Sequence, residues 1–160
     1  MAEATSAERG ARVRFPPPLV FLSGLLLGWA ISRYVAPAPI PIDRSIRLGL
    51  SAFIAVCGIG LLVSSRLHFI RTGQSVVPWK PTPELISMGP YRFTRNPMYV
   101  GMTLLQIGLG LALNNRWIIA FAVPALLIVH FIAVLPEEKY LSEKFGDSYR
   151  TYLTKVRRYL

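Results

Sequence analysis

Residues 97–135 read PMYVGMTLLQIGLGLALNNRWIIAFAVPALLIVHFIAVL, two apolar runs separated by the three polar residues Asn114-Asn115-Arg116. Each run has about the length of a membrane-spanning helix. A connection this short predicts an antiparallel hairpin of two helices. Both open ends of the hairpin must then lie on the same side of the membrane. This geometry places segment 89–99 beside segment 136–140.

Two further apolar runs precede the hairpin. Hydrophobic residues make up 52% of the 160-residue chain and charged residues 16%, well below the roughly 25% of a soluble domain. The runs are apolar all round, and so small a chain cannot bury four such helices in a soluble core. We therefore expect an all-α integral membrane bundle of about four transmembrane helices. The expected spans are 19–35, 46–67, 97–113 and 117–135.

The first run admits a second interpretation as a secretory signal. Arg12 and Arg14 precede it, and Ala36-Pro37-Ala38 follows it in the manner of a cleavage site. Prolines at 37 and 39 are unfavourable around a cleavage site, and the apolar stretch is long for a signal. A retained span is therefore favoured.

Charge predicts the orientation. The chain carries 18 Lys and Arg against 8 Asp and Glu, a formal net charge of +10. With a cytoplasmic N-terminus and four spans, 14 of the 18 basic residues fall on the cytoplasmic side, as the positive-inside rule requires. Both termini are thus predicted to be cytoplasmic, and the proline-rich stretch 36–45 forms an extended outer loop. Basic charge combined with high hydropathy favours membrane lipids over nucleic acid as partners.

The chain is expected to be a single domain, 1–160. It would comprise a polar tail (1–18), the first two spans (19–67) and a catalytic part (68–160). After Pro136, apolar residues recur at helical spacing with Lys and Arg between them, which predicts an amphipathic helix at the membrane interface. Gly146 is a candidate break in that helix. The apolar face would consist of Leu141, Phe145, Tyr149, Tyr152, Val156 and then Tyr159 or Leu160.

Several polar residues near the open end of the hairpin have structural as well as functional interpretations. Asn96-Pro97 fits a helix start, and Glu137-Glu138 fits a first helical turn, where the dipole favours acids. The acidic pair is expected opposite the basic segment 89–99, which favours a polar pocket over a lipid-facing surface. Inside the spans, Thr103 and Gln106 fit interhelical hydrogen bonds.

Other patterns in the sequence indicate packing or structure rather than a functional site. Gly24 and Gly28 form GxxxG, which indicates close helix packing. Cys57 and His68 have no partner at ligand spacing and are interpreted as structural. The single cysteine excludes an internal disulfide, and we find no P-loop, nucleophile elbow, dinucleotide fingerprint or metal-ligand cluster.

Two segments, GPYRFTRNPMYVG at 89–101 and EEKYLSEKFGDSYRTY at 137–152, together resemble a group of membrane enzymes. These are the isoprenylcysteine carboxyl methyltransferases and phospholipid methyltransferases. That group carries G-x-Y-x-x-x-R-H-P-x-Y, then an acidic pair, then L-x-x-x-F-G-x-x-Y. The resemblance covers roughly 70–160.

The resemblance implies S-adenosylmethionine as methyl donor at the cytoplasmic membrane face, and a lipophilic acceptor. Carried over by motif, the cofactor-binding residues are Pro83, Glu84, Leu85, Ile86, Tyr91, Asn96, Pro97, Met98, Tyr99, Glu137 and Glu138. The predicted catalytic residues are Tyr99, Arg95 and His130.

The chemistry of the donor agrees with these residue types. Its ammonium needs a carboxylate such as Glu137, its carboxylate needs donors such as Arg92 or Arg95, and its base needs a wall such as Tyr91 or Tyr99. Methyl transfer from a sulfonium is a direct displacement in which positioning and desolvation do most of the work. A nucleophilic triad or a metal is therefore not required.

Two departures from the family pattern limit the predicted chemistry. Asn96 replaces the motif's histidine and cannot titrate near neutrality, so any base must be His130 or water. Ala133 stands where members that methylate a prenylated carboxylate carry an arginine. The acceptor stays open among a lipid amine, a thiol and an isoprenoid acid, and so does the oligomeric state. The alternatives are a non-catalytic membrane scaffold and, less favoured because the first two spans are poor in polar residues, a small transporter.

Overall fold

The structure, a computed structural model, describes residues 10–11, 13, 15–73, 75, 80 and 82–159. These residues are helical or irregular, with one isolated β-bridge between Thr94 and Arg157, so the all-α prediction is confirmed for them. Most of the predicted tail, residues 1–9, 12 and 14, lies outside the described residues.

The chain divides into two compact units. What we call the apolar unit comprises Pro16–Leu62 and Met98–Val129. What we call the polar unit comprises Val63–Pro97, His130–Leu160 and the residues before Pro16, as far as these are described.

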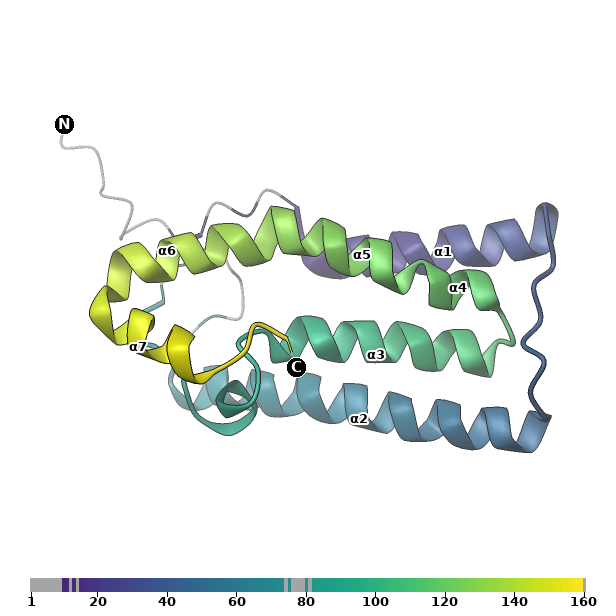
Figure 1. Cartoon of the computed structure of the whole chain (residues 1–160), viewed down its shortest axis with the longest axis horizontal. Coiled ribbons are helices and arrows are strands. Elements are labelled where there is room, and N and C mark those ends of the chain that lie inside the picture. Colours follow the sequence, from purple (N-terminus) through teal and green to yellow (C-terminus); the bar gives the residue numbers. More distant parts are fainter. Residues whose placement is uncertain are drawn as a thin grey trace. The chain divides into compact units, whose positions relative to one another are not determined.

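Helices of the apolar unit run alongside one another (Figure 1). They are α1 (Pro17–Tyr34), α2 (Arg44–Arg71) up to Leu62, α3 (Pro97–Ala112) from Met98, α4 (Arg116–Ala120) and α5 (Ala122–Val129). Glycines permit close approach of the backbones. A Cβ at Gly28 would lie 2.6 Å from the Ile118 nitrogen, and one at Gly58 would lie 2.8 Å from the Gly101 carbonyl oxygen. The GxxxG prediction of tight packing is therefore confirmed at Gly28.

The predicted helical hairpin is present in the apolar unit. Helix α3 ends at Ala112, Asn114 adopts a positive φ of 53°, and the Asn115 side chain accepts hydrogen bonds from the Trp117 and Ile118 nitrogens at the start of α4. Gln106 Nε2 donates across the hairpin to the Ile118 carbonyl at 3.0 Å. This is the interhelical bond expected of Gln106.

Prolines divide the last apolar run, which was expected to form one helix. Pro124 has no N–H for the Ala120 carbonyl, and the chain is interrupted at Phe121 between α4 and α5. Further along, the segment η3 (His130–Val134) is a π-helix. It ends two residues before Pro136, whose ring would clash with a carbonyl four residues back in a regular α-helix.

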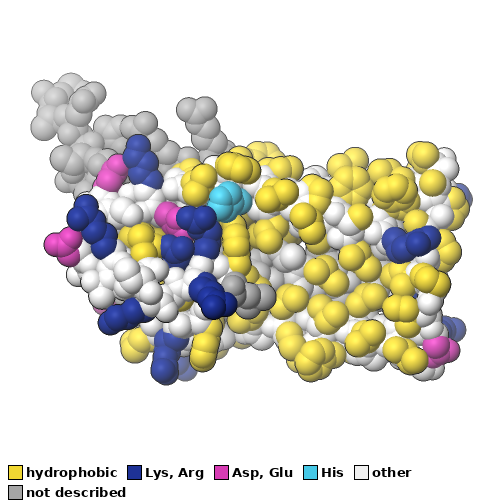
Figure 2. All heavy atoms as spheres, in the orientation of Figure 1, with side chains coloured by type: hydrophobic (Ala, Val, Ile, Leu, Met, Phe, Trp, Pro, Cys, Tyr) yellow, Lys and Arg dark blue, Asp and Glu magenta, His cyan; other side chains and the backbone are white. Residues whose placement is uncertain are grey.

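Two helices are long and apolar enough to cross a membrane, judged by length and composition: Arg44–Arg71 and Arg116–Phe145, the latter running through α4, α5, η3 and α6. Helix α3 is a shorter apolar helix. Figure 2 shows hydrophobic side chains covering the apolar unit, where Phe53 and Val56 are more than two-thirds exposed. The count of four spans stays a prediction.

The polar unit contains the end of α2, a 3-10 turn η2 (Gly89–Arg92), η3, α6 (Leu135–Phe145) and α7 (Asp147–Lys155). Gly146, at a φ of 51°, separates α6 from α7, so the candidate break is real. Tyr149, Tyr152 and Val156 form a buried cluster, against which Leu85, Leu141, Phe145 and Leu153 pack. The predicted apolar face thus forms the core of this unit, and its placement at a membrane interface stays a prediction.

Candidate functional site

The centre of the polar unit is the carboxylate of Glu138, held by two arginines. Arg158 donates to it through both Nε and Nη2, at 2.9 and 2.8 Å. Arg95 Nη1 lies 3.3 Å from the same carboxylate. The side chains of Arg95 and Glu138 are only 12% and 15% exposed, so this is a largely desolvated network. The Arg95 contact also bears out the expected proximity of the segment 89–99 to 136–140.

An extended strap, residues 156–159, lies along residues 94–96. The Arg95 nitrogen donates to the Arg157 carbonyl at 2.9 Å. Thr94 Oγ1 and Asn96 Nδ2 both donate to the Arg158 carbonyl, at 3.1 and 3.0 Å. Asn96 therefore fixes the strap with its side chain. Pro97 begins α3, as the sequence predicted.

The buried Tyr91 and the half-buried Glu137 belong to the same unit. Tyr91 is 8% exposed, and Phe69 packs edge-on against its ring. Burial raises the pKa of the Tyr91 phenol, and the nearby charge of Glu137 raises that pKa further. A hydrogen bond with the fully buried Ser65 lowers the same pKa. Glu137 is thus near enough for its charge to act on the Tyr91 phenol.

Two more tyrosines connect these groups. Tyr152 donates to the Tyr91 carbonyl at 2.7 Å, and burial raises the pKa of Tyr152 to about 12. Burial and the charge of Glu138 raise the pKa of Tyr149, while a hydrogen bond with Arg95 opposes that rise. Both phenols are therefore neutral at physiological pH; Tyr152 donates, whereas Tyr149 accepts from Arg95, which can only donate.

His130 lies at the start of the π-helix and contacts the strap. Its Nδ1 is 2.8 Å from the Tyr159 hydroxyl. Burial raises the pKa of Tyr159. The ring of His130 also packs edge-on against Phe131. His130 is therefore positioned by an aromatic neighbour on each side.

The other predicted cofactor-binding residues lie in the loop 82–88 and at the start of α3. In the loop 82–88, Leu85 packs on the tyrosine cluster and Ile86 is half-buried, whereas Pro83 and Glu84 are exposed. Met98 and Tyr99 belong to the apolar unit, where Tyr99 is buried and its carbonyl accepts from Thr103 Oγ1 at 2.8 Å. The polar unit thus brings together six of the predicted site residues, namely Tyr91, Arg95, Asn96, His130, Glu137 and Glu138.

Sequence reasoning missed the partners supplied by the strap. Arg158 and Tyr159 each bond a predicted site residue, and Thr94 fixes the strap beside Asn96. The available signal was the cluster Arg157-Arg158-Tyr159 directly after the amphipathic pattern. The described residues contain no group of three His, Cys, Asp or Glu side chains that could hold a metal ion.

Comparisons with known proteins identify the family. A family model described as phospholipid methyltransferase matches residues 46–148. A Schizosaccharomyces pombe protein named protein-S-isoprenylcysteine O-methyltransferase is 34% identical over 94 residues, which cover 54% of this chain and 39% of that protein. A Haemophilus influenzae protein described only as uncharacterized is 36% identical over 63 residues, 39% of this chain and 100% of that protein. The matched region contains residues 89–101 and the first part of segment 137–152, and the chain belongs to the phospholipid methyltransferase family.

Proposed function

We propose that this chain is an S-adenosylmethionine-dependent methyltransferase of the membrane, acting on a lipophilic acceptor. One observation carries the proposal: Arg95, whose buried Nε has no hydrogen-bond partner among the described residues, lies in the same unit as Glu137 and the buried Tyr91, whose pKa the charge of Glu137 raises. Membership of a methyltransferase family supports the same chemistry.

The residues present fit the proposed donor. Arg95 Nε is buried and has no hydrogen-bond partner among the described residues, and an orphaned buried donor of this kind is costly unless a ligand satisfies it. Glu137 supplies a carboxylate for an ammonium group, Arg95 a donor for a carboxylate, and Tyr91 a wall for an aromatic base. When bound, the donor supplies a methyl group on a sulfonium that is already activated for displacement.

The chain's own side chains position the reacting groups and exclude water, and they do not attack the methyl donor. Glu138, neutralised by Arg158, holds Arg95 in place. Tyr149 and Tyr152 shield this network from water, which strengthens its charge interactions. His130 Nδ1 is bonded to the Tyr159 hydroxyl; in the tautomer in which Nδ1 donates to this hydroxyl, Nε2 is unprotonated and can take up a proton from an acceptor. Asn96 has a positioning role through the strap.

Ligand binding tests the proposal directly. Purified protein titrated with S-adenosylhomocysteine in a calorimeter should show saturable binding. Glu137→Gln should weaken that binding by about tenfold or more, because it removes a charge-assisted hydrogen bond. Glu143→Gln is the matched control on the same helix, since Glu143 is half exposed and only pairs loosely with Lys139 at 4.0 Å. Equal affinities in the two variants would refute the role of Glu137.

A second measurement distinguishes between two hypotheses, an active enzyme and a non-catalytic scaffold with the same fold. Labelled S-adenosylmethionine incubated with the protein and a membrane lipid extract should yield a labelled lipid-soluble product. Donor binding without any incorporation would favour the scaffold. The acceptor is proposed to be a lipid amine, a thiol or an isoprenoid acid. The fully buried Ala133 offers no cation for a carboxylate, which favours the amine and the thiol over the acid.

We further propose a multi-pass topology with both termini and the site at the cytoplasmic face, which rests on the excess of basic residues there. In a Cys57→Ser background, Lys139→Cys should resist a membrane-impermeant maleimide in intact cells, whereas Arg116→Cys should react. Both positions have exposed side chains in the structure. The opposite labelling pattern would invert the topology.

A further inference from the structure

The two arginines that hold Glu138 contact its carboxylate unequally. Arg158 donates from Nε to one oxygen, Oε1, at 2.9 Å and from Nη2 to the other, Oε2, at 2.8 Å. Arg95 reaches the carboxylate through Nη1, which lies 3.3 Å from Oε1. Arg158 thus occupies both oxygens with the two-point fork that is typical of arginine–carboxylate pairs, and Arg95 shares one of them at a longer distance.

Arg95 keeps an unused hydrogen-bond donor as a result. Its Nε is buried and has no hydrogen-bond partner among the described residues. A fork of the kind that Arg158 makes uses Nε together with one of the terminal nitrogens. Without Arg158, the guanidinium group of Arg95 could close on Glu138 in the same way and use up its own Nε. Competition from Arg158 therefore accounts for the unpaired nitrogen.

The three side chains together carry two positive charges and one negative charge. The Tyr149 phenol accepts a hydrogen bond from Arg95 without adding a charge, because burial raises its pKa and keeps it neutral. The side chains of Arg95 and Glu138 are only 12% and 15% exposed, so water screens these charges weakly. Surplus positive charge beside an unpaired donor suits the carboxylate of a bound ligand.

The strap fixes the position of Arg158. The Arg158 carbonyl accepts hydrogen bonds from Thr94 Oγ1 and Asn96 Nδ2, at 3.1 and 3.0 Å. The preceding carbonyl, of Arg157, accepts from the Arg95 nitrogen at 2.9 Å. The backbone on either side of Arg158 is therefore tied to the segment that carries Arg95, which keeps the two guanidinium groups in a constant relation.

We propose that Arg158 is a positioning residue for the methyl donor. By holding both oxygens of Glu138, it prevents Arg95 from closing on that carboxylate and keeps Arg95 Nε available to the carboxylate of the donor. Arg158 itself does not contact the donor. This inference rests on the proposed methyltransferase function, and it adds a residue that lies outside the matched family region, residues 46–148.

A pair of ligands isolates the donor's carboxylate. S-adenosylmethionine and its decarboxylated form differ in that group alone, and both are titrated into the purified full-length protein with no acceptor added. The wild type should bind S-adenosylmethionine tighter by about tenfold or more, because a charge-assisted hydrogen bond is lost with the carboxylate. Equal binding of the two ligands by the wild type would overturn the proposal, since Arg95 would then not hold the carboxylate.

Arg158→Gln should reduce this preference to about twofold or less, because Arg95 then pairs with Glu138 through its own fork. The affinity for the decarboxylated form should change little, which shows that the variant is folded. A purely structural role for Arg158 would weaken both ligands alike. That result, or an unchanged preference, would refute the positioning role.

Arg158→Lys separates the fork from the charge. Lysine keeps the positive charge but is a point charge that cannot hold two oxygens in a fixed planar fork. The preference for S-adenosylmethionine should therefore fall as it does in Arg158→Gln. A full preference in the lysine variant would show that charge alone is sufficient and would overturn the two-point mechanism.

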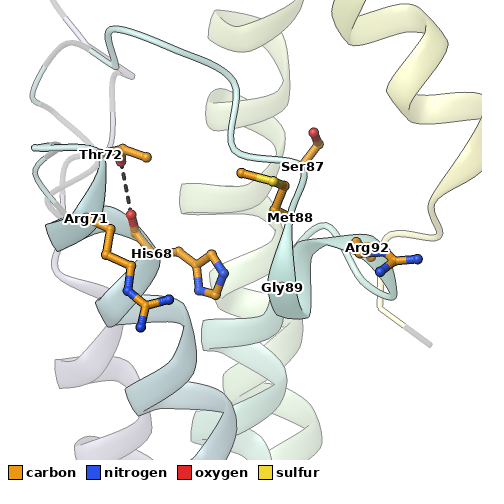
Figure 3. A pocket seen from close by; sticks show the side chains of 7 residues that line it. All are labelled: His68, Arg71, Thr72, Ser87, Met88, Gly89 and Arg92. Carbon is orange, nitrogen blue, oxygen red and sulfur yellow. Dashed lines mark hydrogen bonds between the residues drawn. The ribbon is translucent and has the colours of Figure 1, made fainter.

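Two other arginines of the polar unit are controls for the loss of a positive charge. Arg157 is adjacent in the strap and has an exposed side chain. Arg71 lines a pocket of about 640 Å³ between the end of α2 and the segment 87–92, and that pocket includes none of the three charged residues of the network (Figure 3). Arg157→Gln and Arg71→Gln should keep the wild-type preference. A loss in both would assign the effect to net charge and contradict the proposal.

The same titrations keep the two proposals apart. If neither ligand binds the wild type, the methyl-donor proposal fails and the role of Arg158 falls with it. If the wild type prefers S-adenosylmethionine and Arg158→Gln retains that preference, the methyl-donor proposal stands and only the role of Arg158 is refuted.

Discussion

Two adjacent glutamates in this chain have different partners, and helix geometry explains why. Successive residues of an α-helix point about 100° apart, so Glu137 and Glu138 cannot face the same group. Glu137 acts on the buried Tyr91, whereas Glu138 is held by Arg95 and Arg158. The sequence grouped both as cofactor ligands. The structure places Glu138 in an ion-pair network with Arg95 and Arg158.

Replacing Arg158 should loosen the strap. Arg158→Gln removes two hydrogen bonds to Glu138. We expect a cost of about 1 kcal/mol, because the Arg158 side chain is 38% exposed and solvent weakens the pair. The unfolding midpoint of the purified protein, followed by tryptophan fluorescence, should fall by several degrees.

Arg157→Gln is the control for this change. The side chain of Arg157 is exposed, and its contribution to the strap is its backbone carbonyl. Its substitution should leave the midpoint within about a degree of the wild type. Similar losses in the two variants would show that general positive charge, rather than the Glu138 contact, stabilises the strap.

The reach of sequence reasoning differs from residue to residue. The contact between Arg95 and Glu138 follows from hairpin geometry, because a three-residue turn determines which ends meet. Arg158 pairs with Glu138 across 20 residues that include the turn at Gly146 and an extended segment. A periodic pattern of apolar residues predicts a helix, but it does not predict the course of the chain through such a turn and extended segment. Contacts made through irregular backbone were therefore the ones that the sequence could not predict.

At the scale of elements, apolar length predicted the helices but not their interruptions. The run 117–135 qualifies as one span by composition, yet it is interrupted at Phe121, before Pro124, and continues as a π-helix that ends two residues before Pro136. The π-helix begins at His130, one of the predicted site residues. A wider turn changes the direction in which later side chains point, so the positions of His130 and Glu137 cannot be read from a 3.6-residue repeat.

Close helix contact in the apolar unit gives a test at this scale. Gly28→Ala would place a methyl group 2.6 Å from the backbone nitrogen of Ile118, and overpacking against a rigid backbone costs about 1–3 kcal/mol. We expect a clear fall in the unfolding midpoint. Gly60→Ala is the matched control in the interior of α2, because a Cβ there meets nothing within 4 Å.

The control should raise the midpoint slightly, since alanine is favoured over glycine inside a helix by about 0.5–1 kcal/mol. Opposite signs for the two variants would establish that α1 packs against α4 through Gly28. A neutral Gly28→Ala would contradict the close approach.

At the scale of the whole molecule, charge and apolar surface are divided between the two units. Arginines, glutamates and buried tyrosines gather in the polar unit, and exposed Leu, Val and Phe side chains cover the helices of the apolar unit (Figure 2). The resemblance segments lie mostly in the polar unit. The stability of the polar unit therefore depends on ionisable groups, and changes in pH should affect this stability.

Tyr152 makes this dependence measurable. A phenol has a pKa of about 10 in an unfolded chain, and burial raises the pKa of Tyr152 to about 12 in the fold. Above pH 10 the unfolded state loses the proton first, so the stabilisation from Tyr152 is complete below pH 10 and is lost as the pH rises towards 12. At pH 8, Tyr152→Phe should be less stable by about 1 kcal/mol, because it loses the hydrogen bond to the Tyr91 carbonyl.

The difference between the two proteins should then shrink above pH 10, by about 1.4 kcal/mol for each pH unit, and should vanish near pH 11. Unfolding midpoints measured from pH 8 to pH 11 check this convergence. Tyr34→Phe, at a phenol that is 72% exposed, should follow the wild-type curve throughout. A constant gap between wild type and Tyr152→Phe would mean that Tyr152 is accessible to water, and the shielding of the Arg95–Glu138 network would have to be assigned to other residues.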